Sequence, residues 1–278
     1  MHVDTSCSEA APVRMQRAEG RVRLAFRCRA GATRIKTLYQ EGCAKVRLPA
    51  PLNGAAPEAI LINTAGGLTG GDRLETHVSL GPGTGAAMTT QACERVYRST
   101  GDVAVVTNRL HLATGARLAW LPQESILFDG GRLSRTLDVD LEGNAELVAV
   151  EAILFGRSAM GEMVRNGALH DRWRIRRDGR LIHAEDLRLN GDIAGQLARP
   201  AVLGGKRAMA TVLLVGAEPE RLLDPARAII GDDGGASAWG GKFLARLVAD
   251  TGLALRRRLE PLLSLLLPGQ PLPKVWQL

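Results

Sequence analysis

Seven carboxylate side chains in or beside apolar, strand-like segments are the residues of this chain best suited to chemistry. They are Asp72, Glu75, Glu94, Glu124, Asp129, Glu151 and Glu162. Carboxylate oxygens hold a divalent cation weakly enough to release it, whereas a cage of thiolates would trap it. If several of these side chains line one interior passage, they suit ion transport rather than catalysis. The alternative, which holds for most of them, is a solvated carboxylate paired with one of the many arginines.

Two pairs of glycines lie next to the first two of these carboxylates, within residues 63–75. The glycines are Gly66, Gly67, Gly70 and Gly71, and they follow an apolar run from Ala59 to Ile62. Glycine is used at this density where the backbone needs a positive φ or a close approach. A nucleotide-binding loop is disfavoured, because the segment has no lysine and is followed by a strand-like alternation instead of a helix. We therefore expect a tight turn with Asp72 and Glu75 beside it, an arrangement that suits a cation or the backbone of a partner.

Other catalytic and metal-binding patterns are missing from the sequence. The five histidines are dispersed without an H-x-H or H-x-x-x-H pair, and the four cysteines form no C-x-x-C pair. A closed metal cage of histidine and cysteine is therefore disfavoured. Ser125 is not in a G-x-S-x-G elbow, and no cysteine has a recognisable catalytic context. We do not expect nucleophilic catalysis or nucleotide binding.

The composition is typical of a soluble globular protein, with 45% hydrophobic and 23% charged residues. The formal net charge of +7 favours acidic partners, but the longest basic run is Arg256–Arg258, so nucleic acid is disfavoured as a partner. The N-terminus lacks the apolar core of a signal peptide, and the apolar stretch at 261–268 is too short to span a bilayer. We expect a cytoplasmic protein with reduced thiols and no membrane contact.

Short strand-like runs separated by turn residues dominate residues 20–189. Val22 to Cys28 alternates apolar and polar side chains with the period of two that a half-buried strand requires. Further runs lie at 76–80, 86–91, 103–112, 116–121, 135–141, 145–154, 171–175 and 180–189. No helical segment of ordinary length intervenes, which argues against a parallel α/β fold. The pattern predicts an elongated, mainly β architecture, either a sandwich or a solenoid-like stack.

The last third of the chain has a helical character. Residues 218–230 carry apolar side chains at helical spacing behind Pro219, and residues 251–267 predict a helix interrupted by Pro261. Residues 231–235 are expected to form a loop between them. The proline-rich tail that ends near Trp276 is expected to pack back on its own domain.

Five blocks in a fixed order resemble the UreD (UreH) family of urease accessory proteins. They are Asn-Thr-Ala-Gly-Gly-Leu-Thr-Gly-Gly-Asp at 63–72, Thr-Thr-Gln-Ala-Cys-Glu-Arg-Val-Tyr-Arg-Ser at 89–99, Leu-Pro-Gln-Glu-Ser-Ile-Leu-Phe at 121–128, Phe-Gly-Arg-Ser-Ala-Met-Gly-Glu at 155–162 and Pro-Lys-Val-Trp at 273–276. Besides the glycine pairs, the residues that carry the resemblance are Tyr97, Arg98, Pro122, Gln123, Gly156, Arg157, Gly161 and Trp276. The sequence departs from the family at Cys93-Glu94-Arg95, where a lysine usually precedes the tyrosine, and at Lys274, where arginine is usual.

The resemblance implies one mainly β domain over residues 1–278. Its expected fold is an elongated, β-helix-like stack of short strands with a few α-helices in the C-terminal third. Residues 1–18 are expected to form a flexible segment, and residues 218–278 the helix-containing part.

The resemblance also implies a cytosolic scaffold that is not an enzyme and binds no cofactor tightly. Its expected partners are apo-urease, a helical accessory protein (UreF type) and a nickel-carrying GTPase (UreG type). Nickel released by the GTPase would pass the seven carboxylates transiently on its way to the urease active site. From the residues alone, the alternative is an elongated β-protein that binds an acidic polymer, such as a nucleic acid or a polyanionic glycan, through its Arg-rich surface.

Overall fold

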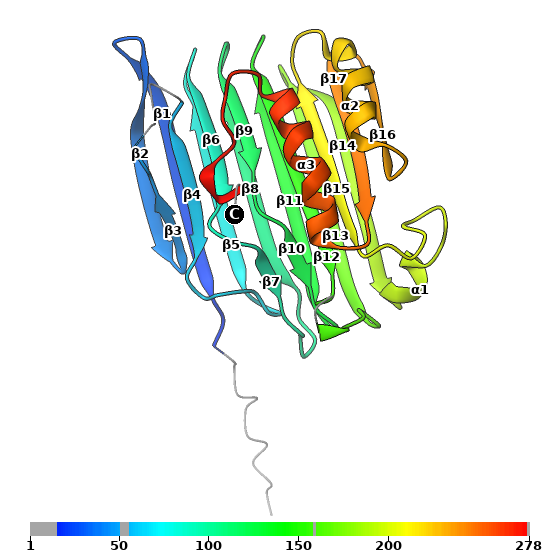
Figure 1. The fold of residues 1–278 in the computed structure, drawn as a ribbon. Coiled ribbons are helices and arrows are strands. Elements are labelled where there is room, and N and C mark those ends of the chain that lie inside the picture. Colours follow the sequence, from blue (N-terminus) through cyan, green and yellow to red (C-terminus); the bar gives the residue numbers. More distant parts are fainter. Residues whose placement is uncertain (1–15, 51–55, 158–159, 277–278) are drawn as a thin grey trace, which may run out of the picture.

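Two β-sheets face each other across a buried interior, and helices cover part of one sheet from outside (Figure 1). The structure, a computed structural model, describes residues 16–50, 56–157 and 160–276. The flexible segment predicted for residues 1–18 therefore lies, except for residues 16–18, outside the described residues.

The first sheet has seven strands in the order β14-β13-β11-β8-β5-β1-β2. Their bounds are β1 (Glu19–Arg29), β2 (Ala32–Gly42), β5 (Arg73–Leu80), β8 (Ala104–Leu112), β11 (Arg132–Leu141), β13 (Gly167–Arg177) and β14 (Arg180–Gly191). The five central strands run parallel to one another, whereas β2 and β14 close antiparallel hairpins at the two ends.

The second sheet has ten strands, eight of them in the order β16-β17-β15-β12-β9-β6-β4-β3. Their bounds are β3 (Ala44–Arg47), β4 (Glu58–Asn63), β6 (Gly85–Thr90), β9 (Arg117–Leu121), β12 (Glu146–Phe155), β15 (Ala208–Val215), β16 (Gly234–Trp239) and β17 (Lys242–Ala249). The short strands β7 (Glu94–Val96) and β10 (Ser125–Leu127) pair with each other, and β10 also pairs with β12. From β4 to β12 the main strands are parallel, and β15 to β17 add antiparallel strands.

The chain alternates between the sheets, so that each circuit adds one parallel strand to each of them. β4 is followed by β5, β6 by β8, β9 by β11 and β12 by β13, with the first of each pair in the second sheet. Parallel sheets usually need crossover helices. In this chain a strand of the facing sheet serves as the crossover. The predicted mainly β, β-helix-like stack is confirmed.

The predicted strands agree with the observed ones to within a few residues; for example, 103–112 corresponds to β8 and 145–154 to β12. Several elements were not predicted: the strands β2, β3, β7 and β10, the strands β15 to β17 in the last third, and the short helix α1 (Ile193–Leu197). The loop predicted at 231–235 ends at Asp233, because Gly234 and Gly235 belong to β16. β15 is a nearly continuous apolar run that is buried along almost its whole length. Such a strand lacks the period-two signal that identifies a half-buried strand.

The helices of the last third lie against the outer side of the second sheet (Figure 1). The segment predicted at 218–230 forms a 3₁₀ turn, η2 (Pro219–Leu222), and α2 (Leu223–Ile230). The predicted interruption at Pro261 is wrong, because α3 (Gly252–Leu266) runs through it. An interior proline costs about 3 kcal/mol, but each buried leucine contributes about 2 kcal/mol. The helix buries Leu255, Leu259, Leu262, Leu263 and Leu266.

The C-terminal tail packs back on the sheet, as predicted. Trp276, in the 3₁₀ turn η3 (Lys274–Trp276), is fully buried and donates its indole N–H to the carbonyl of Leu121 at 2.9 Å. The guanidinium of Arg256 on α3 lies 5.1 Å from the centre of the Trp276 ring. Among the described residues, none of the helices has the length and apolar character needed to cross a membrane.

Candidate functional site

A band of polar side chains crosses the interior between the two sheets. Along β12, Leu147 and Ala149 belong to the apolar core between the sheets, and the next side chain on the same face is Glu151. Residues in register on neighbouring strands share a face, so the band continues across the strands. The paired residues are Thr76 with Asn108, Arg135 with Asp171, and Glu151 with Thr211, and all six are buried.

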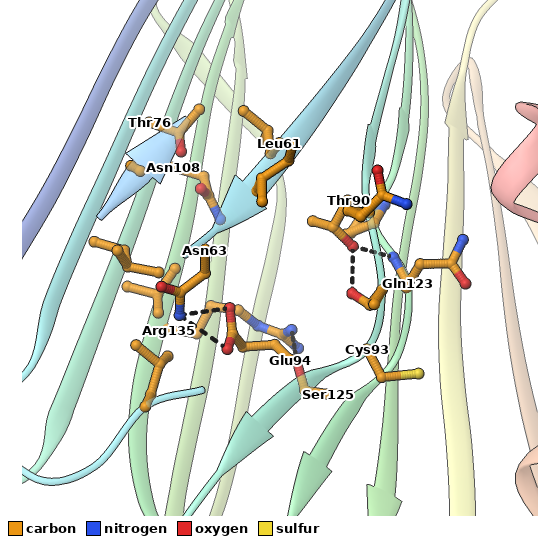
Figure 2. Close-up of a pocket in the computed structure, with 18 of the residues that line it drawn as sticks. Leu61, Asn63, Thr76, Thr90, Cys93, Glu94, Asn108, Gln123, Ser125 and Arg135 are labelled. Atoms are coloured by element: carbon orange, nitrogen blue, oxygen red, sulfur yellow. Dashed lines mark hydrogen bonds between the residues drawn. The ribbon is translucent and has the colours of Figure 1, made fainter. Parts of the chain in front are cut away.

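One cavity along this band has a volume of about 250 Å³. Its wall is largely apolar, with Leu61, Leu74 and Val106 among the residues that form it. Polar groups converge on it from both sheets and from the short strands β7 and β10 (Figure 2). They include Asn63, Thr76, Glu94, Asn108, Gln123, Ser125, Arg135 and Glu151. A mainly apolar cavity with a few placed polar groups is typical of sites that bind a small ligand.

Glu94 projects into this cavity from β7. The side-chain amide of Asn63 donates to both carboxylate oxygens, at 3.1 and 3.3 Å (Figure 2). Burial raises the pKa of Glu94 to about 7, although the hydrogen bond from Asn63 opposes the rise. Near neutral pH the side chain is therefore partly protonated, and a cation that enters the cavity would favour its ionised form.

Two members of a buried charged triad, Arg135 and Glu151, line the cavity. The guanidinium of Arg135 donates to the two carboxylate oxygens of Asp171 at 3.1 and 2.7 Å and lies 2.5 Å from Glu151 Oε2. Trp120 donates its indole N–H to Glu151 Oε1 at 3.3 Å. Burial raises the pKa of Glu151 to about 7, with the nearby Asp171 adding to the rise and Arg135 opposing it.

A second cavity, of about 100 Å³, lies beyond the triad. Its wall includes Glu151 and Asp171, together with Glu185, Thr211 and Arg246. Because Glu151 lines both cavities, the triad forms the partition between them. The polar band therefore connects two cavities that lie along the stack of strands.

Asp72 and Glu75 do not line either cavity. The buried Asp72 accepts the backbone N–H of Thr69 at 2.7 Å and that of Ala18 at 2.8 Å. It thus closes the glycine turn and holds the chain that precedes β1. Glu75 lies between inward-facing neighbours on β5 and accepts a hydrogen bond from Arg21 at 3.0 Å on the outer face of the first sheet. The predicted tight turn is present, but it aims both carboxylates at structural partners.

Glu124 follows Pro122 and Gln123 at the end of β9 and anchors helix α3. It accepts from Arg256 Nε at 3.1 Å and from Arg256 Nη2 at 2.6 Å, and the thiol of Cys93 lies 3.4 Å from it. Pro122 and Gln123, unlike Glu124, line the first cavity. The position of α3 is therefore tied to the wall of that cavity.

Asp129 and Glu162 organise the loops at one edge of the stack. Asp129 accepts the backbone N–H groups of Arg165 and Asn166 at 2.8 and 3.0 Å, and the hydrogen bond from Asn166 lowers its pKa. Glu162 accepts from Arg157 Nε at 2.8 Å, and this bond lowers its pKa. Both carboxylates are thus held ionised by neighbours on the loops.

The glycine pairs allow loops from successive circuits of the chain to stack on this edge. The N–H of Leu68 donates to the carbonyl of Arg95 at 2.7 Å, and the N–H of Tyr97 donates to the carbonyl of Leu68 at 2.7 Å. Gly67 has a φ of 152°, and a Cβ at this position would collide with the ring of Tyr97. A side chain at Gly70 would collide with Ser99. Gly67 and Gly70 therefore serve the close approach of neighbouring loops, whereas Gly66 serves the positive φ of the turn.

The remaining motif residues belong to the same stacked loops. The Tyr97 ring meets Phe128 edge-on at 5.1 Å, and the Arg157 guanidinium lies 4.6 Å from the centre of the Phe128 ring. Arg98 pairs with Asp129 at 3.0 Å. The two glycines Gly156 and Gly161 have positive φ values of 77° and 65°.

Sequence reasoning missed the band residues Thr76, Asn108 and Thr211, and also Asn63, Arg135 and Asp171. A signal existed for the last two. Arg135 occupies the phase of β11 that otherwise carries Leu133 and Leu137, and Asp171 occupies the phase of β13 that carries leucine and tryptophan. A charged residue at a core position of an alternating strand is uncommon unless it is paired. Asn63 gave no such signal, since it stands at the end of β4.

In the described ranges 16–50, 56–157 and 160–276, no group of three or more His, Cys, Asp or Glu side chains is placed to hold a metal ion. The cysteines at 28, 43 and 93 are free. The carboxylates of the band therefore lie in pairs or singly along the two cavities.

Comparison with known proteins identifies close relatives. The family model described as UreD urease accessory protein matches residues 18–277. The chain is 51% identical over 275 residues to a urease accessory protein UreD of Agrobacterium fabrum, covering 99% of this chain and 96% of the relative. It is 54% identical over 270 residues to the one from Rhizobium leguminosarum bv. viciae, covering 97% and 98%. It is 53% identical over 266 residues to urease accessory protein UreD 1 of Brucella abortus, covering 94% and 95%.

Proposed function

Because the chain belongs to the UreD family of urease accessory proteins, we propose that it is a scaffold in urease maturation. It acts in the cytoplasm, is not itself an enzyme, and docks a helical accessory protein (UreF type) and a nickel-carrying GTPase (UreG type) onto apo-urease. Family membership supports the maturation role. The choice of these partners and the route of the metal extend the proposal beyond it.

Nickel released by the GTPase passes through the interior of this scaffold along the polar band. The observation that carries this step is the pair of cavities that share Glu151. Of the seven predicted carboxylates, we assign Glu94 and Glu151 to the path, because they line the cavities. Isolated oxygen ligands bind nickel weakly, so the ion is released onward and not stored. The other five carboxylates are engaged by the glycine turn, by Arg21 on β1, by loops and by α3.

Reconstitution from purified components tests both parts of the proposal. Apo-urease, the two accessory partners, GTP and Ni²⁺ are combined with the wild-type chain or with Glu94→Gln/Glu151→Gln, and urease activity and bound nickel are measured. We expect several-fold lower nickel incorporation with the double variant and unchanged co-purification of the complex. The matched control is Glu146→Gln on β12, whose side chain points away from the cavities and pairs with Arg117 at 3.1 Å.

The two parts fail in different ways. Full activation by the double variant would overturn the internal path and leave the scaffold role intact. If the wild-type chain does not co-purify with apo-urease and the accessory partners, the scaffold role itself is wrong.

A further inference from the structure

Arg135 is a buried cation at the one place where the two cavities meet. Its side chain is 5% exposed, and those of Glu151 and Asp171 are 2% and 8% exposed. It belongs to β11 of the first sheet, next to Asp171 on β13, whereas Glu151 reaches it from β12 of the facing sheet. The guanidinium therefore bridges both sheets across the polar band.

Arg135 contacts Asp171 with better hydrogen-bond geometry than it contacts Glu151. The pair with Asp171 is a two-pronged hydrogen bond of good geometry, and Nη1 also donates to Ser125 Oγ at 3.1 Å. Glu151 Oε2 is in contact with Nη1 but has no aligned hydrogen-bond donor among the described residues. A buried carboxylate oxygen without an aligned donor is poorly satisfied. Its neutralisation depends on the nearby positive charge, which another cation could supply.

We propose that Arg135 is a resident cation that occupies the place of a passing metal ion between Glu151 and Asp171, and that nickel crosses the partition by exchanging with it. This inference rests on the proposed function. Two carboxylates neutralise one divalent cation, so the exchange leaves no excess negative charge in the partition. When the ion leaves, the guanidinium returns and again prevents the two carboxylates from retaining metal.

The first cavity offers the displaced guanidinium a destination. Arg135 and Glu94 both line this cavity, and Glu94 is held by the neutral amide of Asn63 with no salt bridge to a cation among the described residues. The guanidinium can therefore pair with Glu94 while the metal ion occupies the partition. Arginine suits this role because it stays charged in both positions.

The test uses the purified full chain alone, with Ni²⁺ as the probe in equilibrium dialysis. We expect Arg135→Met to bind one more Ni²⁺ per chain than the wild type, at least about tenfold more tightly than any site at the partition of the wild type. The triple variant Arg135→Met/Glu151→Gln/Asp171→Asn, which also replaces both carboxylates by neutral amides, should lack this added site. Arg135→Lys keeps a resident charge and should gain no site. If Arg135→Met does not fold, Arg135→Gln replaces it, since it keeps a donor without the charge.

Two results would overturn the inference. The first is that neither Arg135→Met nor Arg135→Gln binds more Ni²⁺ than the wild type. The other is an added site that persists when both carboxylates are amides. In the reconstituted system, Arg135→Met should retain nickel in the scaffold and deliver it several-fold more slowly; delivery at the wild-type rate would refute exchange. If the wild-type chain fails to support activation, the proposed function falls, while the dialysis result still decides the chemistry of the partition.

Discussion

Replacement of Glu94 by glutamine should remove a loss of stability that the wild type shows as the pH rises. The pKa of Glu94 is raised to about 7 by burial, from an ordinary value near 4.5. A carboxyl group with a raised folded-state pKa contributes stability below its unfolded pKa and loses that contribution as pH rises through its folded pKa. Glutamine resembles the protonated side chain at every pH, so Glu94→Gln should remove this loss.

The size of the stability difference follows from the rise in the pKa of Glu94. A rise of this size corresponds to about 3 kcal/mol when the group is fully ionised, and solvent screening at a half-buried side chain reduces it to about 1–2 kcal/mol. Glu94→Gln should therefore match the wild type near pH 4 and exceed it by about this amount at pH 8.5, with the difference in free energy of unfolding growing between these values.

Urea unfolding at a series of pH values measures the difference in free energy of unfolding. Glu146→Gln is the matched control for removing a carboxylate from a half-buried position outside the cavities, where Glu146 pairs with Arg117. A difference between Glu94→Gln and the wild type that stays constant from pH 4 to 8.5, or that reverses sign, would refute the assignment of Glu94 as a carboxylate forced into an apolar cavity.

Three further predictions concern the frame around the cavities. Gly67→Ala should lower the free energy of unfolding by about 2 kcal/mol or more, because its Cβ would collide with Tyr97. Gly66→Ala, whose Cβ would meet open space, should lower it by less. Equal losses from the two variants would contradict the stacking of the loops. Trp276→Ala should cost about 3–5 kcal/mol in urea unfolding, and a loss below about 1 kcal/mol would show that the tail is not anchored. Replacing the buried triad by apolar residues should leave stability unchanged or raise it, yet abolish nickel delivery in reconstitution; a large loss of stability would mean that the triad holds the fold. That variant is Arg135→Met/Glu151→Leu/Asp171→Leu.

The strands could be predicted from the sequence because their alternation reflects a local property, the burial of one face. The position of each carboxylate depends on more than that. Glu94 meets Asn63 31 positions away, and Arg135 meets Asp171 36 positions away. These separations correspond to one circuit of the chain, and the sequence shows no repeat that would reveal it. Asp72 and Glu75 also looked suited to an ion path from their spacing alone, but hydrogen bonds to a turn and to Arg21 direct them elsewhere.

Helix α3 also shows where prediction from local sequence fails. Pro261 predicts a break by a local rule, but the sheet beneath the helix offers an apolar surface that runs past the proline. A prediction from local sequence fails where the free energy gained by burying the neighbouring side chains exceeds the local cost of the residue itself. The continuous burial of β15 removed the alternation on which strand prediction depends, for the same reason.

Folding alone does not require the polar band. The strands that carry it place apolar residues at the inward positions on either side: Leu133 and Leu137 flank Arg135, and Ala149 and Ile153 flank Glu151. The same sheets could therefore have closed the interior with aliphatic side chains in this row as well. Buried ion pairs contribute little net stability, since desolvation offsets their attraction. A row of charges between two apolar layers, with cavities on both sides, would serve the ion route that we propose, whereas a purely structural core gains little from it.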